Sequence, residues 1–309
     1  MSSVSTDSAL QRFTYDWLVR FAELHPMKLT DIKDIEKFYD IDGRIETHPL
    51  KPYNPNHSKY AAISPLFTTV IGRYMPSLFY GGLVYVKNGT IQKCSLSTVN
   101  KCNIMIGSLV KFTDALPGMI TWFKNNRVFF YGESLLIMKK TVGSNITFDE
   151  LKYLLKCCKF GNFNKNIELY ATLTVPLLFS ELWPHLKRCE VLRLYIDNVV
   201  YGENMAQVLR KNRSIPRDMR LDGVDVSDNV LLEIIDYFVS LPVRPTAYEF
   251  NFRHQKPVSL GEAIYDKYVS VGHSKEFYVA AARPFQTMAV REFHRKVQCS
   301  FFNELVWYA

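Results

Sequence analysis

Apolar and polar residues alternate in four short segments in the second half of the chain. Each segment reads apolar, polar, apolar, polar, and a period of two is typical of a β-strand with one buried face. If Leu169, Leu194, Leu221 and Phe250 are equivalent, the segments follow one another at 25, 27 and 29 residues. The segments are Ile167–Tyr170, Leu192–Tyr195, Met219–Asp222 and Tyr248–Asn251.

A stretch with helical spacing of apolar residues follows each of these segments. The predicted helices cover residues 177–186, 203–210, 228–238 and 260–268. A strand and a helix every 20 to 29 residues is the period of leucine-rich repeats. We therefore predict an α/β fold whose C-terminal half is a leucine-rich-repeat-like β-α solenoid, with parallel strands, right-handed crossovers and helices outside. The alternative is an ordinary α/β sheet whose spacing happens to be regular.

Residues 1–42 carry a different pattern. Apolar residues recur at helical spacing from Phe13 to Leu24 and again from Leu29 to Tyr39, which predicts a helix pair. Three prolines with asparagine and histidine follow within residues 43–60, a composition typical of a linker. The predicted organisation is therefore an N-terminal helical segment (1–42), a Pro-rich linker (43–60) and an α/β leucine-rich-like domain (61–309).

Between the linker and the repeats the pattern predicts a mixed α/β segment. Asn88-Gly89 lies between two strand-like runs, at 83–86 and 90–93, and this pair suits a type I′ turn because both positions need a positive φ. Short apolar runs at 128–131 and 135–138 have strand length. Thr147 followed by Glu150 is a capping box that opens a helix and begins the repeat region, about residues 146–270.

The residues after the repeats are predicted to close the solenoid. Apolar runs of strand length recur at 277–280, 288–293 and 301–307. An open repeat end would expose its core, so residues 271–309 are expected to form a C-terminal cap.

The strand alternation also predicts a binding face. When the four equivalent apolar residues point into the core, their neighbours form two rows on the opposite face of the sheet. Tyrosine and arginine are enriched in binding hot spots, and the strand face is where such repeats usually bind proteins. The alternative is a solvated charge ladder of little energetic value. The predicted protein-binding face consists of Glu168, Tyr170, Arg193, Tyr195, Arg220, Asp222, Glu249 and Asn251.

The net charge of +8 is concentrated in the middle of the chain. Residues 61–147 contain nine basic and two acidic side chains among many aromatic residues. Basic and aromatic residues together could hold a phosphate backbone and stacked bases, so a nucleic-acid-associated protein is the alternative function. The cations are spread singly, which fits a role in solubility equally well.

The chain lacks the sequence motifs of the common cofactor-binding and hydrolytic sites, and we expect no enzyme activity, no cofactor and no metal. Asp218, Asp222, Asp225 and Asp228 are the densest acidic cluster. Their spacing lacks the alternation of a calcium loop, and Ser227 or Asp228 is better interpreted as the cap of the following helix.

No secretory signal opens the chain, and the most apolar stretch, residues 63–86, carries Arg73 near its middle. These features predict a cytoplasmic or nuclear protein without a membrane anchor.

Three segments resemble a known family. They are residues 146–155, residues 189–194, and residues 221–226 with 231–235. Their apolar patterns resemble the F-box-associated (FTH-homology) domains of nematodes, over about residues 146–255. The resemblance implies a leucine-rich-like module that binds a protein substrate for a ubiquitin ligase. Such proteins usually carry an N-terminal F-box, opening with Leu-Pro, that docks on the ligase adaptor; residues 13–39 contain no Leu-Pro.

Overall fold

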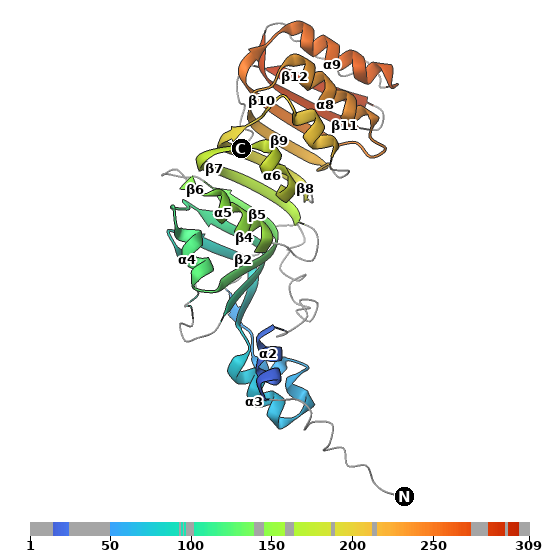
Figure 1. Ribbon diagram of the computed structural model, residues 1–309. Helices are drawn as coiled ribbons and strands as arrows, with labels where there is room; N and C mark the ends of the chain where they lie inside the picture. The colour runs from blue at the N-terminus through green and yellow to red at the C-terminus, as the bar shows by residue number, and fades with distance from the viewer. Residues whose placement is uncertain are drawn as a thin grey trace, which may run out of the picture. The chain divides into compact units, whose positions relative to one another are not determined.

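A computed structural model shows an α/β protein with a large, mostly parallel mixed sheet (Figure 1). It describes residues 15–24, 50–92, 94, 96, 102–138, 145–157, 164–186, 189–211, 215–272, 284–293 and 296–302. The chain divides into two compact units. The first unit contains residues 1–85, 91–110 and 121–131, and the second contains residues 86–90, 111–120 and 132–309.

The first unit combines a helical cluster with the beginnings of three long strands. Its strands follow the order β1 (Lys51–Pro52), β2 (Ser77–Lys87), β4 (Asn103–Thr113) and β5 (Val128–Met138), while β3 (Thr90–Ile91) pairs with β2. Its helical elements are α2 (Tyr15–Leu24), η3 (Pro55–His57), η4 (Ala61–Ile63), α3 (Pro65–Tyr74) and most of α4 (Met119–Asn125).

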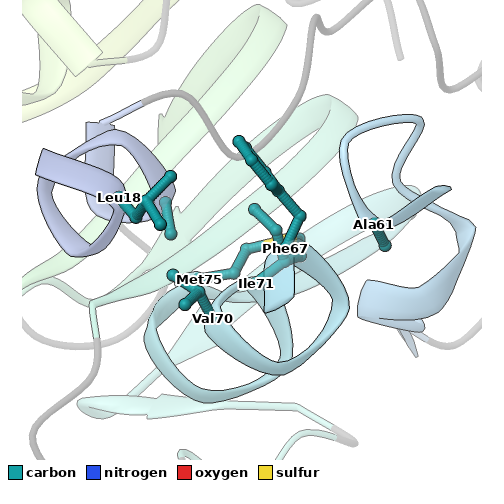
Figure 2. Close-up of a cluster of buried hydrophobic side chains, with 7 residues drawn as sticks. Leu18, Ala61, Phe67, Val70, Ile71 and Met75 are labelled. Carbon is teal, nitrogen blue, oxygen red and sulfur yellow. The ribbon is translucent and has the colours of Figure 1, made fainter. Parts of the chain in front are cut away.

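The helical cluster has its own apolar core (Figure 2). Leu18 and Ala22 of α2 are buried together with Ala61, with Phe67, Val70 and Ile71 of α3, and with Met75, which follows α3. The first predicted N-terminal helix is thus confirmed, and the second, at 29–39, lies outside the described residues.

The described part of the predicted linker is folded into this unit. Leu50 and Ser58 are buried, Tyr53 packs against the helical cluster, and Asn54 caps η3. The first compact unit therefore continues through the described part of the predicted linker, where Tyr53, between two of the prolines, packs against the helical cluster.

Two upstream predictions concern strands. The hairpin at β2 and β3 is confirmed: Asn88 and Gly89 have φ of 48° and 78°, as a type I′ turn requires. The runs at 128–131 and 135–138 form one strand, β5, instead of two. Near the start of β5 the buried apolar side chains are at even positions, Val128 and Phe130, whereas from Leu135 onward they are at odd positions. The alternation therefore changes phase within one continuous strand.

The second unit contains the predicted repeats. Its strand order is β5, β7 (Asn164–Leu178), β8 (Cys189–Val200), β9 (Asp218–Val224), β10 (Ala247–Lys256), β11 (Phe285–Phe293) and β12 (Lys296–Phe302), and β6 (Asn145–Ile146) pairs with β7. The strands from β5 to β10 are parallel, whereas β11 and β12 are antiparallel. Its other helices are α5 (Phe148–Cys157), α6 (Phe179–Leu186), α7 (Met205–Arg210), α8 (Asp228–Ser240) and α9 (Val258–Ser270).

The predicted strand alignment is confirmed. Leu194 lies opposite Leu169 and Leu221, and Leu221 lies opposite Phe250. All four side chains are 0% exposed. They form one buried row across four parallel strands, on the face that the helices cover.

Helix starts follow the predicted capping. Glu150 accepts a hydrogen bond from the Thr147 amide at 3.0 Å, and the Thr147 hydroxyl accepts one from the Glu150 amide at 3.2 Å, so the capping box is formed. Ser227 caps α8 by accepting from the Val230 amide. The predicted C-terminal runs correspond in part to β11 and β12; residues 277–280 and 303–307 lie outside the described residues.

Candidate functional site

The strand register brings the predicted face residues together in two rows. In the first row, Arg193 lies opposite Glu168 and Arg220, and Arg220 lies opposite Glu249. In the second row, Tyr170 lies opposite Tyr195. Asp222 and Asn251 follow the paired residues Leu221 and Phe250 in their strands, at the point where the register of β9 and β10 shifts, and they share a side-chain hydrogen bond. The strand register thus shows the predicted rows for Glu168, Tyr170, Arg193, Tyr195, Arg220 and Glu249, while binding by this face stays a prediction.

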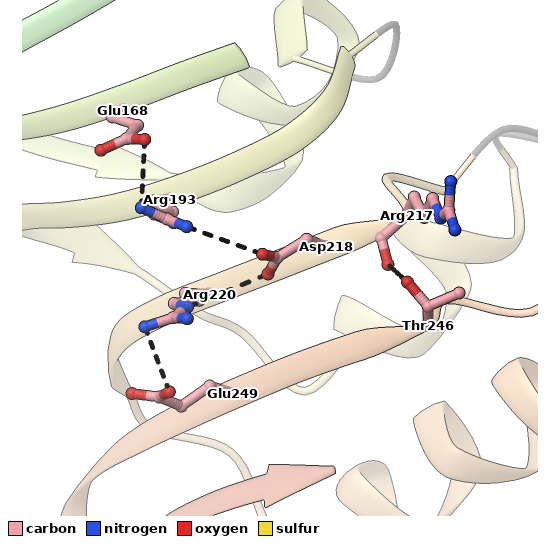
Figure 3. A network of polar contacts seen from close by, with 7 residues as sticks. All are labelled: Glu168, Arg193, Arg217, Asp218, Arg220, Thr246 and Glu249. Atoms are coloured by element: carbon pink, nitrogen blue, oxygen red, sulfur yellow. Dashed lines mark hydrogen bonds and ion pairs between the residues drawn. The ribbon is translucent and has the colours of Figure 1, made fainter. Parts of the chain in front are cut away.

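Ion pairs connect the first row across four strands (Figure 3). Arg193 donates a 3.1 Å hydrogen bond to Glu168, and its other terminal nitrogen lies 3.7 Å from a carboxylate oxygen of Asp218. Arg220 lies 3.9 Å from Asp218 and 3.6 Å from Glu249. Asp218 joins the two arginines, whereas the sequence pattern indicates it only as a member of the acidic cluster.

The hydrogen-bonding capacity of this row is not saturated. The Nε of Arg193 and the Oδ1 of Asp218 are buried and have no hydrogen-bond partner among the residues that the structure describes. Three of the four ion pairs are longer than 3.5 Å, beyond hydrogen-bond distance. Partly exposed ion pairs contribute only about 0 to 1 kcal/mol each to stability. The stabilisation that these ion pairs provide is therefore too small to explain why five charged side chains lie together on this face.

The second row begins with two stacked tyrosines. The rings of Tyr170 and Tyr195 are 4.6 Å apart between centroids and nearly parallel, at 6°. Burial, followed by the charge of Glu168, raises the pKa of Tyr170. Burial is the largest cause that raises the pKa of Tyr195, and the neighbouring Tyr170 adds to this effect. A hydrogen bond with Arg220 acts in the opposite direction and lowers the pKa. Both hydroxyls therefore stay protonated at neutral pH and can donate hydrogen bonds.

The row ends in polar groups that are less accessible. Burial raises the pKa of Asp222, and its hydrogen bond with Asn251 opposes that shift. Asp197, which accepts a 2.9 Å hydrogen bond from Thr172, raises it further. Asn251 lies on the predicted face but is only 6% exposed, and Thr287, opposite it on β11, is 2% exposed. Asn251 is therefore corrected from an exposed binding residue to a buried group that supports Asp222.

The acidic cluster is divided among structural roles. Asp228, in the first turn of α8, pairs with the buried Lys256 at 2.9 Å, and Asp225 lies 4.0 Å from His254. Asp218 belongs to the ion-pair row. Within the part of the chain that the structure describes, no group of three or more His, Cys, Asp or Glu side chains could hold a metal ion.

The basic middle segment is only partly described. Arg73, Lys87, Lys124 and Arg127 are exposed, and Lys111 is half-buried. The remaining four cations lie outside the described residues: Lys93, Lys101, Lys139 and Lys140.

Comparison with protein-family models, with curated proteins and with solved structures found no match for this chain. None of the helices in the described ranges is long and apolar enough to cross a bilayer.

Proposed function

We propose that this chain is a non-enzymatic protein-interaction module. It binds its partner through the ladder face, which we define as Glu168, Tyr170, Arg193, Tyr195, Asp218, Arg220, Asp222 and Glu249. The observation that carries this proposal is the five-residue ion-pair row beside a stacked tyrosine pair, all on parallel strands and all partly exposed. Aromatic and arginine side chains held rigidly in this way favour tight contacts with a partner protein, because little side-chain entropy is lost on binding.

The finer fold we propose is a leucine-rich-like β-α solenoid. Bonds between residues 24 to 30 positions apart support it, because each bond joins one repeat to the next. Asn198, for example, donates to the Leu173 carbonyl at 2.8 Å. Glu203 accepts from the Ser227 amide, and Lys256 donates to the Val226 carbonyl. Repeat proteins are stabilised by such interactions between neighbours.

A role as the substrate-recognition subunit of a ubiquitin ligase is the more specific proposal, and it rests on the family resemblance. In that case the ladder face binds the substrate. The ligase adaptor would contact the N-terminal helical cluster, where Trp17, Ile63 and Leu66 are exposed apolar residues.

The ladder face can be tested by affinity purification of the tagged chain from the cytosol of its own cells, followed by mass spectrometry. The double variant Arg193→Ala, Tyr195→Ala should lose the specific partner. The matched control is Arg210→Ala, Tyr237→Ala, which removes the same side-chain types from helices α7 and α8 and should retain the partner.

The same experiment separates the alternatives. Equal capture by the wild type and the ladder-face variant would contradict the proposed face. A set of partners that is lost with nuclease and at high salt would favour nucleic-acid association through residues 61–147. Recovery of a ligase adaptor with a cullin would support the ligase role, and a salt-resistant set without them would leave an independent binding module.

A further inference from the structure

Strand β12 ends the sheet of the second unit. All seven of its residues pair with β11, from Lys296 opposite Phe293 to Phe302 opposite Thr287, without a register shift. Among the described strands none pairs with its other edge. With respect to the described strands, this outer edge of β12 is therefore unpaired and presents a row of backbone N–H and C=O groups.

This edge lacks the features that usually prevent pairing between sheets. Its sequence, Lys-Val-Gln-Cys-Ser-Phe-Phe, contains no proline and no acidic residue, and its single charge is at the first position. Proteins commonly protect an edge with proline, inward-pointing charges, bulges or a very short strand. The opposite end of the strand order is protected in this way, because β1 has two residues and one of them is Pro52. A head-to-tail pairing of β12 with β1 is thereby disfavoured.

The strand is complementary to itself in the antiparallel direction. With a two-fold axis at Cys299, the central residue, Gln298 lies opposite Ser300 of a second copy, and Val297 lies opposite Phe301. Lys296 lies opposite Phe302, so no like charges meet. Amide and hydroxyl face each other on one side of the sheet, and apolar residues face each other on the other side.

The edge is also held in place before any partner arrives. Val297 and Cys299 are 0% exposed, and the ring of Phe301 packs 4.7 Å from that of Phe285. A Cβ on Gly261 of α9 would lie only 3.3 Å from the Phe301 ring, so the helix and the strand are in close contact. A strand that is already ordered loses little conformational entropy on pairing.

We infer that β12 pairs with β12 of a second copy of this chain and forms a two-fold symmetric dimer with a continuous sheet. Isologous pairing closes the assembly at two copies, whereas an unpaired edge would invite further association. Ser300 lies opposite Ala289, which lies opposite Glu249. The rows of the ladder face thus continue toward the second copy, on the same side of the joint sheet. The dimer does not depend on what the ladder face binds.

The test is the molar mass of the full chain, 35.9 kDa as a monomer, by light scattering over a dilution series. The wild type should have twice the monomer mass and dissociate only on dilution. The double variant Gln298→Glu, Ser300→Glu places two like-charge pairs across the axis and should weaken the dimer between about 2- and 30-fold. Arg291 lies opposite Gln298 on β11, so a carboxylate at position 298 is tolerated within one copy.

A charge swap tests the register itself. The variant Gln298→Glu, Ser300→Lys places opposite charges across the axis and should restore the dimer to at least wild-type strength. Equal melting temperatures of the three proteins at low concentration show that the monomers are folded. Should the two-glutamate protein not fold, Gln298→Lys with Ser300→Lys provides the like-charge arm.

Three results would overturn the inference. They are a wild type that is monomeric at every concentration, a dimer that is insensitive to the like charges, and a like-charge monomer that the charge swap does not restore. If the wild type is monomeric, the edge of β12 could pair only with a strand of another protein, and that would be a different proposal.

Discussion

Leu194 and Arg193 are neighbours on β8 whose side chains lie on opposite faces of the sheet. Leu194 belongs to the buried row between Leu169 and Leu221, whereas Arg193 belongs to the ladder face. Replacing each residue with alanine therefore separates the contribution of the core from that of the ladder face. The two changes are one position apart in the sequence and should differ strongly in their effect on stability.

The structure sets the expected size of each effect. Leu194 is 0% exposed, so Leu194→Ala removes buried methyl groups and leaves a cavity, at a cost of about 3 to 5 kcal/mol in the free energy of unfolding. The Arg193 side chain is 30% exposed. Because water and neighbouring charges screen its ion pairs with Glu168 and Asp218, Arg193→Ala should cost only about 1 kcal/mol.

Urea unfolding followed by circular dichroism measures both costs. Leu194→Ala should lower the midpoint of the transition that unfolds β8 by at least twice the shift of Arg193→Ala, with the denaturant slope unchanged. Equal shifts, or a larger shift for Arg193→Ala, would refute the assignment of these residues to opposite faces. In the affinity purification the order should be reversed, so that Arg193→Ala reduces partner capture more than Leu194→Ala does.

Two further predictions concern the helix starts that join the repeats. Hydrogen bonds from the Ser227 hydroxyl and amide lower the pKa of Glu203 in the folded protein. The Glu203 carboxylate therefore contributes its full stabilisation above the ordinary glutamate pKa, and this stabilisation is lost as the pH falls through the lowered pKa of the folded state. Glu203→Gln should therefore be less stable than wild type at neutral pH, with the difference vanishing in acid melts; a difference that persists in acid would contradict this. Thr147→Ala should cost about 1 kcal/mol in urea unfolding because it opens the capping box of α5, while Thr147→Ser should be neutral.

Much of the candidate site could be predicted because the strands there are regular. Side chains alternate strictly along a strand, so identifying Leu194 as buried also places Arg193 and Tyr195 on the other face. The similar spacing of the repeats then suggests which residues lie opposite each other, and the registers of β7, β8, β9 and β10 agree. The turn at Asn88-Gly89 and the capping box at Thr147 were predictable for the same reason, since both depend on residues close in sequence.

Other features could not be predicted because they depend on distant contacts. The prolines near residue 52 indicate a linker, but packing of Tyr53 against the helical cluster makes the segment part of a folded unit. Asn251 alternates like an exposed residue, and the surroundings created by β11 bury it. Asp218 joins the two arginines only because its carboxylate lies 3.7 Å from Arg193, on the neighbouring strand, and 3.9 Å from Arg220, on its own strand.

The sequence by itself determined the four repeat strands, the helices that follow them, the caps at Thr147 and Ser227, and the face of the sheet that the residues of the repeat strands occupy. These properties follow from backbone geometry and from the burial of apolar side chains over short distances. Only the tertiary structure decided which charges pair, which polar groups lose contact with water and which strand ends the sheet. Those properties depend on the distances between side chains that the chain brings together from positions 25 or more residues apart.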